Sequence, residues 1–230
     1  MKRLVFLLAI IGIYACQSNS DFINYRNDPF QFPYPEYCLK AKEINLQQTV
    51  DNSNQVFIEA LNERIAFDVD ESVSLQTKKK FDSYYLWSDE KLFGVINLEK
   101  EVYMGCSGAA KSYQKDFCSA FSSTEEYFSK LFKLTPDDLT LDEYAGIGNK
   151  WIVHNKGSWF KNVNQLFVYQ LEDIVAFRRD FKSSSDQKMK TELLIFPKAI
   201  APNYVGIGLT TQDSKIVETI ISSFQAKQLN

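Results

Sequence analysis

The chain of 230 residues has one histidine and four cysteines, and after residue 15 it has no long hydrophobic run. A single histidine disfavours a zinc site, because such sites usually combine several histidine and cysteine ligands at set spacings. No later segment approaches the roughly 20 apolar residues that a membrane-spanning helix needs. We therefore expect no metal, no cofactor and no transmembrane helix in the body of the chain.

Basic residues are also too few for a nucleic-acid-binding protein. The chain has 26 basic and 29 acidic residues, a formal net charge of −3, and it has no basic block. Nucleic acid is therefore not an expected partner. Two short cationic groups, residues 78–80 and 178–179, are predicted to be solvated charges on a turn or a strand face. Contact with an acidic protein partner or with anionic lipid is the alternative for each.

The N-terminus carries a signal of a different kind. Lys2 and Arg3 precede an apolar run of twelve residues, 4–15, which is too short to span a bilayer and is typical of an export signal. The following Ile-Tyr-Ala-Cys at 13–16 resembles the lipobox of bacterial lipoprotein signal peptides, whose cysteine becomes diacylated. The resemblance implies that residues 1–15 are removed and that a lipid on Cys16 holds the protein on a membrane. Gln17, in place of aspartate, implies the outer membrane, with the domain facing the periplasm or the cell surface.

Residues 16–39 form a lipid-anchored segment of unusual composition. Three of the chain's six prolines lie at 29, 33 and 35, and they should keep the segment extended. Aromatic side chains between them include Phe30, Phe32 and Tyr34, which are candidate binding residues. We expect this tether to lie against the domain, with docking on a partner as the alternative.

Acylation of Cys16 would leave Cys38, Cys106 and Cys118 in an oxidising compartment, where one disulfide is expected. If residues 106–118 formed one helix, the two cysteines would lie about 18 Å apart, whereas a disulfide needs Cα atoms within about 7 Å. A local bridge between Cys106 and Cys118 is favoured. A bridge from Cys38 to either of them is the alternative.

Residues 40–230 are predicted to be a single globular α+β domain. The strand signals, which are alternating or short apolar runs, fall at residues 65–69, 81–87, 92–98, 151–154, 166–170, 174–181, 192–196 and 204–210, whereas 56–61 is ambiguous between helix and strand. Because the connections are short, neighbouring strands should be antiparallel. We expect a mainly antiparallel sheet of about seven or eight strands, flanked by helices.

Three helices are predicted beside the sheet. Ser123 and Glu126 form a capping box for the first, and the second begins at Thr135-Pro136 and ends at Gly146 or Gly148. The third is capped by Asp213 and carries an apolar face that should pack on the sheet.

This order of elements, together with the ending Ile-Ile-Ser-Ser-Phe at residues 220–224, resembles the Mog1/PsbP-like superfamily over residues 55–226. The resemblance implies an α+β binding module and carries over no catalytic residue.

One stretch has the residue types of a hydrolase. Residues 105–109, Gly-Cys-Ser-Gly-Ala, are similar to a G-x-S-x-G nucleophile elbow, in which Ser107 would need a base. His154 is the one available histidine, and Asp142 lies between the two in sequence. We favour a structural turn beside a cysteine, because the elbow belongs to parallel sheets. Trp151 and Trp159 are further binding candidates, as an exposed aromatic platform or as core residues.

These patterns favour a non-enzymatic, lipid-anchored envelope protein that binds another protein. An immunity-type inhibitor of a toxin and an accessory subunit of an envelope complex both fit. A lipid or small-molecule carrier is the first alternative, because the aromatic content of 14% permits a pocket between sheet and helices. A serine hydrolase that uses Ser107 and His154 is the second.

Overall fold

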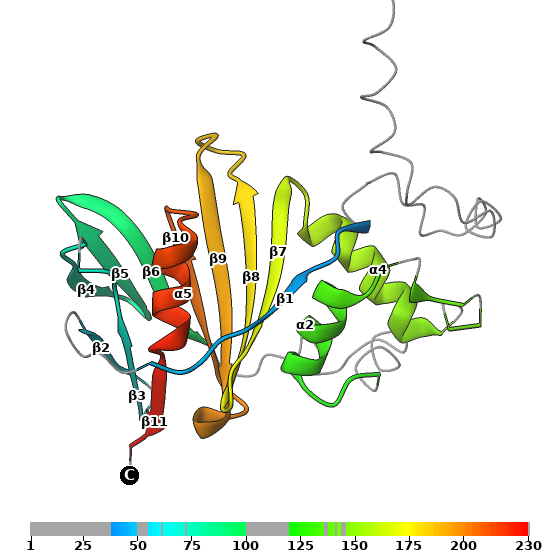
Figure 1. The fold of residues 1–230 in the computed structure, drawn as a ribbon, viewed down its shortest axis with the longest axis horizontal. Coiled ribbons are helices and arrows are strands. Elements are labelled where there is room, and N and C mark those ends of the chain that lie inside the picture. The colour runs from blue at the N-terminus through cyan, green and yellow to red at the C-terminus, as the bar shows by residue number, and fades with distance from the viewer. Residues whose placement is uncertain are drawn as a thin grey trace, which may run out of the picture.

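The computed structural model describes residues 38–49, 55–60, 62–71, 73–99, 120–135, 138–140, 142–143 and 146–229. These ranges contain an eight-stranded sheet of order β1-β7-β8-β9-β10-β6-β5-β4 and a three-stranded sheet of order β11-β3-β2 (Figure 1). The strands are β1 (Lys42–Asn45), β2 (Gln55–Ala60), β3 (Glu63–Asp68), β4 (Gln76–Lys80), β5 (Ser83–Ser88), β6 (Lys91–Glu99), β7 (Val163–Gln170), β8 (Ile174–Lys182), β9 (Met189–Pro197), β10 (Tyr204–Leu209) and β11 (Gln225–Gln228). The helices are α2 (Thr124–Lys133), α4 (Ile147–Trp159), α5 (Ser214–Ser222) and the short 3-10 helix η4 (Lys198–Ile200).

Strand pairing is antiparallel throughout both sheets except between β1 and β7, which run parallel. The strands predicted at 81–87 and 92–98, with a four-residue loop at 88–91 between them, are confirmed as the hairpin of β5 and β6, but Ser88 pairs with Lys91, so the loop has two residues. Its turn residues Asp89 and Glu90 have φ angles of 48° and 61°, the left-handed pair of a tight two-residue hairpin. The α+β class with a mainly antiparallel sheet is therefore confirmed.

The large sheet lies between two apolar layers because its strands are apolar on both faces. In β8, Ala176 faces the core formed with the three-stranded sheet and α5, whereas Phe177 faces the core formed with α2 and α4. Side chains of successive strand residues point to opposite faces, so one strand contributes to both cores. Figure 1 shows α5 and the small sheet on one side of β9 and β10, and α2 and α4 beside β7.

Two of the three predicted helices begin where their caps predict, whereas the second, from Thr135-Pro136 to Gly146 or Gly148, is wrong because residues 139–140 are not helical and Gly146 is the N-cap of α4. Ser123 accepts a hydrogen bond from the backbone N–H of Glu126 at the start of α2, and Asp213 accepts one from Lys215 at the start of α5. The apolar face predicted for the last helix is also confirmed, because Val217, Ile220 and Ile221 are the buried residues of α5. In the described part of the chain, no helix has the length and apolarity needed to cross a membrane.

The strand predicted for residues 151–154 is wrong, because these residues lie inside α4. The β-branched pair after Trp151 resembles a strand, but Ile152, Lys156 and Phe160 are all buried and recur every four residues, as on one face of a helix. Three strands were not predicted, namely β1, β4 and β11. All are short and mostly polar, and β4 is exposed at every residue.

Arg178 and Asp180 form a buried ion pair, which corrects the prediction that Arg178 is solvated. The Arg178 side chain is 1% exposed and donates to both carboxylate oxygens of Asp180, at 2.8 and 2.7 Å. Its remaining donors reach the Tyr169 hydroxyl, the Ser214 hydroxyl and the Gln212 carbonyl. Thr191 donates a further hydrogen bond to Asp180. The pair thus joins β7, β8 and β9 to the start of α5.

We predict that Asp180→Asn lowers the free energy of unfolding by about 3 to 5 kcal/mol, because it leaves the Arg178 charge buried without its partner. Urea denaturation followed by circular dichroism measures the change. Asp173→Asn, which removes an exposed ion pair with Lys198, is the matched control and should cost less than about 1 kcal/mol. Equal losses in the two variants would contradict the central role of the buried pair.

Candidate functional site

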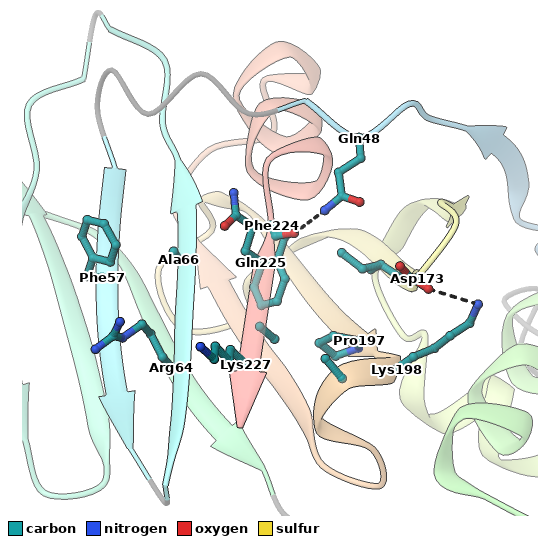
Figure 2. Close-up of a pocket in the computed structure, with 13 residues that line it drawn as sticks. Gln48, Phe57, Arg64, Ala66, Asp173, Pro197, Lys198, Phe224, Gln225 and Lys227 are labelled. Carbon is teal, nitrogen blue, oxygen red and sulfur yellow. Dashed lines mark hydrogen bonds and ion pairs between the residues drawn. The ribbon is translucent and has the colours of Figure 1, made fainter. Parts of the chain in front are cut away.

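A groove with a volume of about 870 Å³ is present in the described structure. Figure 2 shows that it lies around β11, between the face of the small sheet and the ends of β8 and β9. Its lining combines cationic and apolar side chains from segments far apart in sequence. The lining residues are Gln48, Phe57, Arg64, Ala66, Asp173, Ile174, Pro197, Lys198, Ala199, Phe224, Gln225, Ala226 and Lys227. We refer to this site as the groove.

Three cations border the groove. Arg64 and Lys227 are direct partners in the pairing of β3 with β11, so both side chains project from the same face of the small sheet. Arg64 is held by Glu59 at 2.6 Å, and Lys198 lies 3.5 Å from Asp173. Lys227 forms no ion pair with any described residue. Among the described residues, the groove therefore offers one ammonium group outside any ion pair and two cations in exposed, and hence weak, ion pairs.

The floor of the groove is apolar. Phe224 is fully buried, and its ring stacks on Phe67 with 6.2 Å between centroids. Its backbone carbonyl accepts a hydrogen bond of 3.3 Å from Gln48, as drawn in Figure 2. Phe57 is 60% exposed on β2. An exposed aromatic beside a cationic rim is suited to a ligand with both acidic and apolar groups.

A second hollow, of about 460 Å³, lies at the turn between β5 and β6. Its lining mixes both signs of charge and includes Lys78, Asp89 and Glu90 around Trp87. With one cation and two carboxylates in its lining, this hollow does not favour an anionic ligand.

Trp159, a predicted binding residue, lies on the other side of the large sheet. It is 36% exposed and packs edge-on against Phe128, with 5.7 Å between ring centroids. The Arg179 guanidinium lies 5.6 Å from the Trp159 ring, donates to the Trp159 carbonyl and is paired with Glu192. The Trp159 ring is thus partly buried against Phe128 and partly exposed to solvent, and it does not line the groove.

Lys156 is an unpredicted feature of the junction between α2 and α4. Its side chain is 0% exposed, and its ammonium group donates to the carbonyls of Leu134, at 2.7 Å, and Phe132, at 3.4 Å. Burial lowers the pKa of Lys156 to about 7, against the opposing influence of Asp138. The Phe132 carbonyl also accepts the backbone N–H of Ala41. Lys156 of α4 therefore binds the carbonyl groups at the end of α2, next to the point where Ala41 is hydrogen-bonded to the same helix.

Among the predicted catalytic residues, only part of the set lies within the described structure. Asp142 is exposed, and His154 lies within α4, where its backbone alone is described. Ser107 lies outside the described residues. The backbone of Trp151 lies in the same helix. Nothing in the described geometry therefore supports a hydrolase.

Several other predicted residues also fall outside the described ranges. They are Cys16, Phe30, Phe32, Tyr34, Cys106 and Cys118. Cys38 is disulfide-bonded, and its partner lies outside these ranges. A bond at Cys38 is the pairing predicted as the alternative to a local bridge.

The groove residues were not predicted as a site. Arg64 and Lys227 are separated by most of the chain, and their neighbourhood follows from the pairing of β3 with β11. The strand β11 has the sequence Gln-Ala-Lys-Gln, which carries no apolar alternation. The described residues contain no group of three or more histidine, cysteine or acidic side chains placed to hold a metal ion.

Comparisons with protein-family models, with curated proteins and with solved structures find no match to this chain. The resemblances to lipoprotein signal peptides and to the Mog1/PsbP-like superfamily therefore stay predictions.

We predict that the free energy of unfolding rises by about 2 kcal/mol between pH 7 and pH 9 because of Lys156. The pKa of Lys156 is lowered in the folded protein, so across this range the unfolded chain binds more protons than the folded one, and stability increases with pH. Urea titrations at each pH measure the effect. Lys156→Met should abolish this rise, whereas the exposed control Lys161→Met should keep it. A wild-type stability that is flat over this range would refute the lowered pKa.

Proposed function

We propose that this chain is a lipid-anchored protein of the cell envelope that acts as a non-enzymatic protein-binding module. We further propose that the groove is the docking site of its partner. The observation that carries the proposal is the combination of Arg64, Lys198 and Lys227 around an apolar floor, in a groove of about 870 Å³. The overall charge of the chain is negative, so a groove bordered by three cations stands out against it.

The shape and charge of the groove favour an acidic segment of a protein as its occupant. Arginine and lysine donate charge-assisted hydrogen bonds to carboxylates, and Arg64 has donors that a carboxylate can use beside Glu59. The exposed ring of Phe57 supplies apolar area beside these charges. An aspartate- or glutamate-containing segment with one apolar side chain would satisfy both features.

The proposed location rests on the N-terminal signal and is supported by the cysteines. A disulfide at Cys38 is typical of an oxidising compartment such as the periplasm or the cell surface. If Cys16 carries lipid, the partner of Cys38 must be Cys106 or Cys118, and a 106–118 bridge is then excluded. Two or more acyl chains on Cys16 would give stable anchoring.

Two kinds of partner fit this proposal. An immunity-type protein would bind and neutralise a toxin, and an accessory subunit would bind a component of an envelope complex. In both cases the partner would present an acidic segment to the groove, and no chemical step is required of the chain.

A carrier of a small acidic amphiphile is the second candidate. The groove volume of about 870 Å³ falls in the range of small-molecule sites. The three cations would hold an acidic head group, and the apolar floor would hold the tail. Native mass spectrometry of gently purified protein would show a bound ligand in this case, and a clean apo mass would exclude it.

We predict that Arg64→Gln with Lys227→Gln weakens partner binding at least about tenfold, because charge-assisted hydrogen bonds are lost. Affinity purification of the tagged protein from solubilised membranes identifies the partner, and titration with that partner measures the affinity. Lys182→Gln with Lys188→Gln changes the charge equally at exposed positions where β8 ends and just before β9 begins, and it should leave binding unchanged. Recovery of no stoichiometric partner, or an equal effect of both double variants, would overturn the proposal.

We also predict that Cys16→Ser prevents incorporation of labelled palmitate and releases the protein from the membrane fraction, because no other acylation site is proposed. Metabolic labelling and membrane fractionation measure both effects. Cys38→Ser is the matched control and should keep the label. A membrane-bound Cys16→Ser protein, or an unlabelled wild type, would refute the anchor.

A further inference from the structure

The hairpin of β4 and β5 ends in an exposed aromatic residue. Lys80 pairs with Ser83, so Phe81 and Asp82 form a two-residue turn. Phe81 has a φ of 56°, in the left-handed region that bulky residues rarely adopt and that hairpins usually fill with glycine or asparagine. Its side chain is 83% exposed, the highest value among the large hydrophobic residues described. Folding alone therefore does not explain a phenylalanine here.

The three residues before this turn are all lysines. Lys78, Lys79 and Lys80 are exposed, and none of them forms an ion pair within the described ranges. Lysines at 40, 130, 133, 190, 198 and 215 are paired with acidic residues, whereas those at 182, 188 and 227 also form no ion pair with a described residue, so it is the run of three adjacent lysines that distinguishes the hairpin. Lysines on an edge strand also discourage pairing with other chains. That role accounts for the charges but not for Phe81.

We propose that this hairpin, with the three lysines and Phe81 at its tip, is a contact site for an anionic lipid bilayer. Lysine side chains reach lipid phosphates with flexible stems, and an aromatic ring is favoured at the boundary between head groups and acyl chains. The Lys80 ammonium lies 5.9 Å from the centre of the Phe81 ring, so charge and ring project together from one tip.

A lipid surface fits this hairpin better than an acidic protein does. A specific protein interface usually buries about 800 Å² on each partner, whereas this site is one five-residue edge strand and a turn. The nearby hollow takes in Lys78 but lies toward the other turn, with Asp89 and Glu90 in its lining. A fluid bilayer needs no complementary shape and accepts a protruding ring at variable depth.

The hairpin shares no residue with the lining of the groove, although its tip lies at the same end of the large sheet as the groove residues Ile174 and Pro197. Ser83 pairs with Asn97 near the end of β6, and Glu99 pairs with Tyr204 at the start of β10. The tip therefore lies at the end of the large sheet opposite to the turn between β8 and β9, where Lys182 pairs with Met189. The lysines of that distant turn supply a control with equal charge.

The charge test compares binding of the full-length chain to vesicles of phosphatidylcholine alone and to vesicles with about one third phosphatidylglycerol. Each lysine near an anionic surface contributes about a fivefold factor, so Lys78→Gln with Lys80→Gln should lower partitioning to the anionic vesicles about 25-fold. Lys182→Gln with Lys188→Gln should lower partitioning to the anionic vesicles much less than Lys78→Gln with Lys80→Gln does. Equal losses in the two variants, or equal wild-type binding to both vesicles, would overturn the proposal.

The ring is tested by Phe81→Asn, which suits the left-handed turn and should not weaken folding. We expect this variant to unfold at the same or a higher urea concentration and to partition at least about fivefold less to the anionic vesicles. In vesicles with brominated acyl chains, the tryptophan fluorescence of Phe81→Trp should be quenched more than that of the wild type, because the added tryptophan at the tip contacts the acyl chains. Unchanged partitioning of Phe81→Asn, or no added quenching in Phe81→Trp, would show that the tip does not enter the bilayer.

Discussion

The buried ion pair of Arg178 and Asp180 is the constraint on which the arrangement of the layers depends. A guanidinium without solvent must have all its N–H groups bonded, and here the five donors are satisfied by Asp180, Tyr169, Ser214 and Gln212. These partners come from β7, β8 and the start of α5. The helix cannot slide over the sheet without leaving a buried donor unbonded, so the network fixes where α5 begins and how it crosses the strands.

The groove is a consequence of where α5 ends. Phe224 follows Ser223, the C-cap of α5, is buried against Phe67, and leads into β11, which pairs with β3. This connection places the small sheet beside α5. The start of β8, at Ile174, and the end of β9, at Pro197, line the groove on the other side of β11. Arg64, Lys198 and Lys227 then border one hollow although they come from three separate segments. The same packing leaves the β4–β5 hairpin at the opposite edge of the large sheet from β1, with its lysines exposed.

Elements with strong local signals could be predicted. The caps at Ser123 and Asp213, the hairpin of β5 and β6 and the core strands β8 and β9 follow from side-chain hydrogen bonding and from runs of apolar residues. Residues 151–154 were mistaken for a strand because short apolar runs suit both helices and strands. The strands β4 and β11 carry no apolar pattern, since an edge strand can form through backbone pairing alone.

The sequence by itself determined the α+β class, the helix caps and the scarcity of metal-binding and catalytic residues, because each depends on composition or on residues a few positions apart. Only the tertiary structure decided that Arg178 is buried while Lys79 is exposed, although both lie in strands beside other cations. Burial depends on which layer covers each face of the sheet, and no local pattern specifies that. Strand pairing across 160 residues likewise placed Lys227 beside Arg64, since hydrogen bonding between strands is insensitive to their separation in the chain.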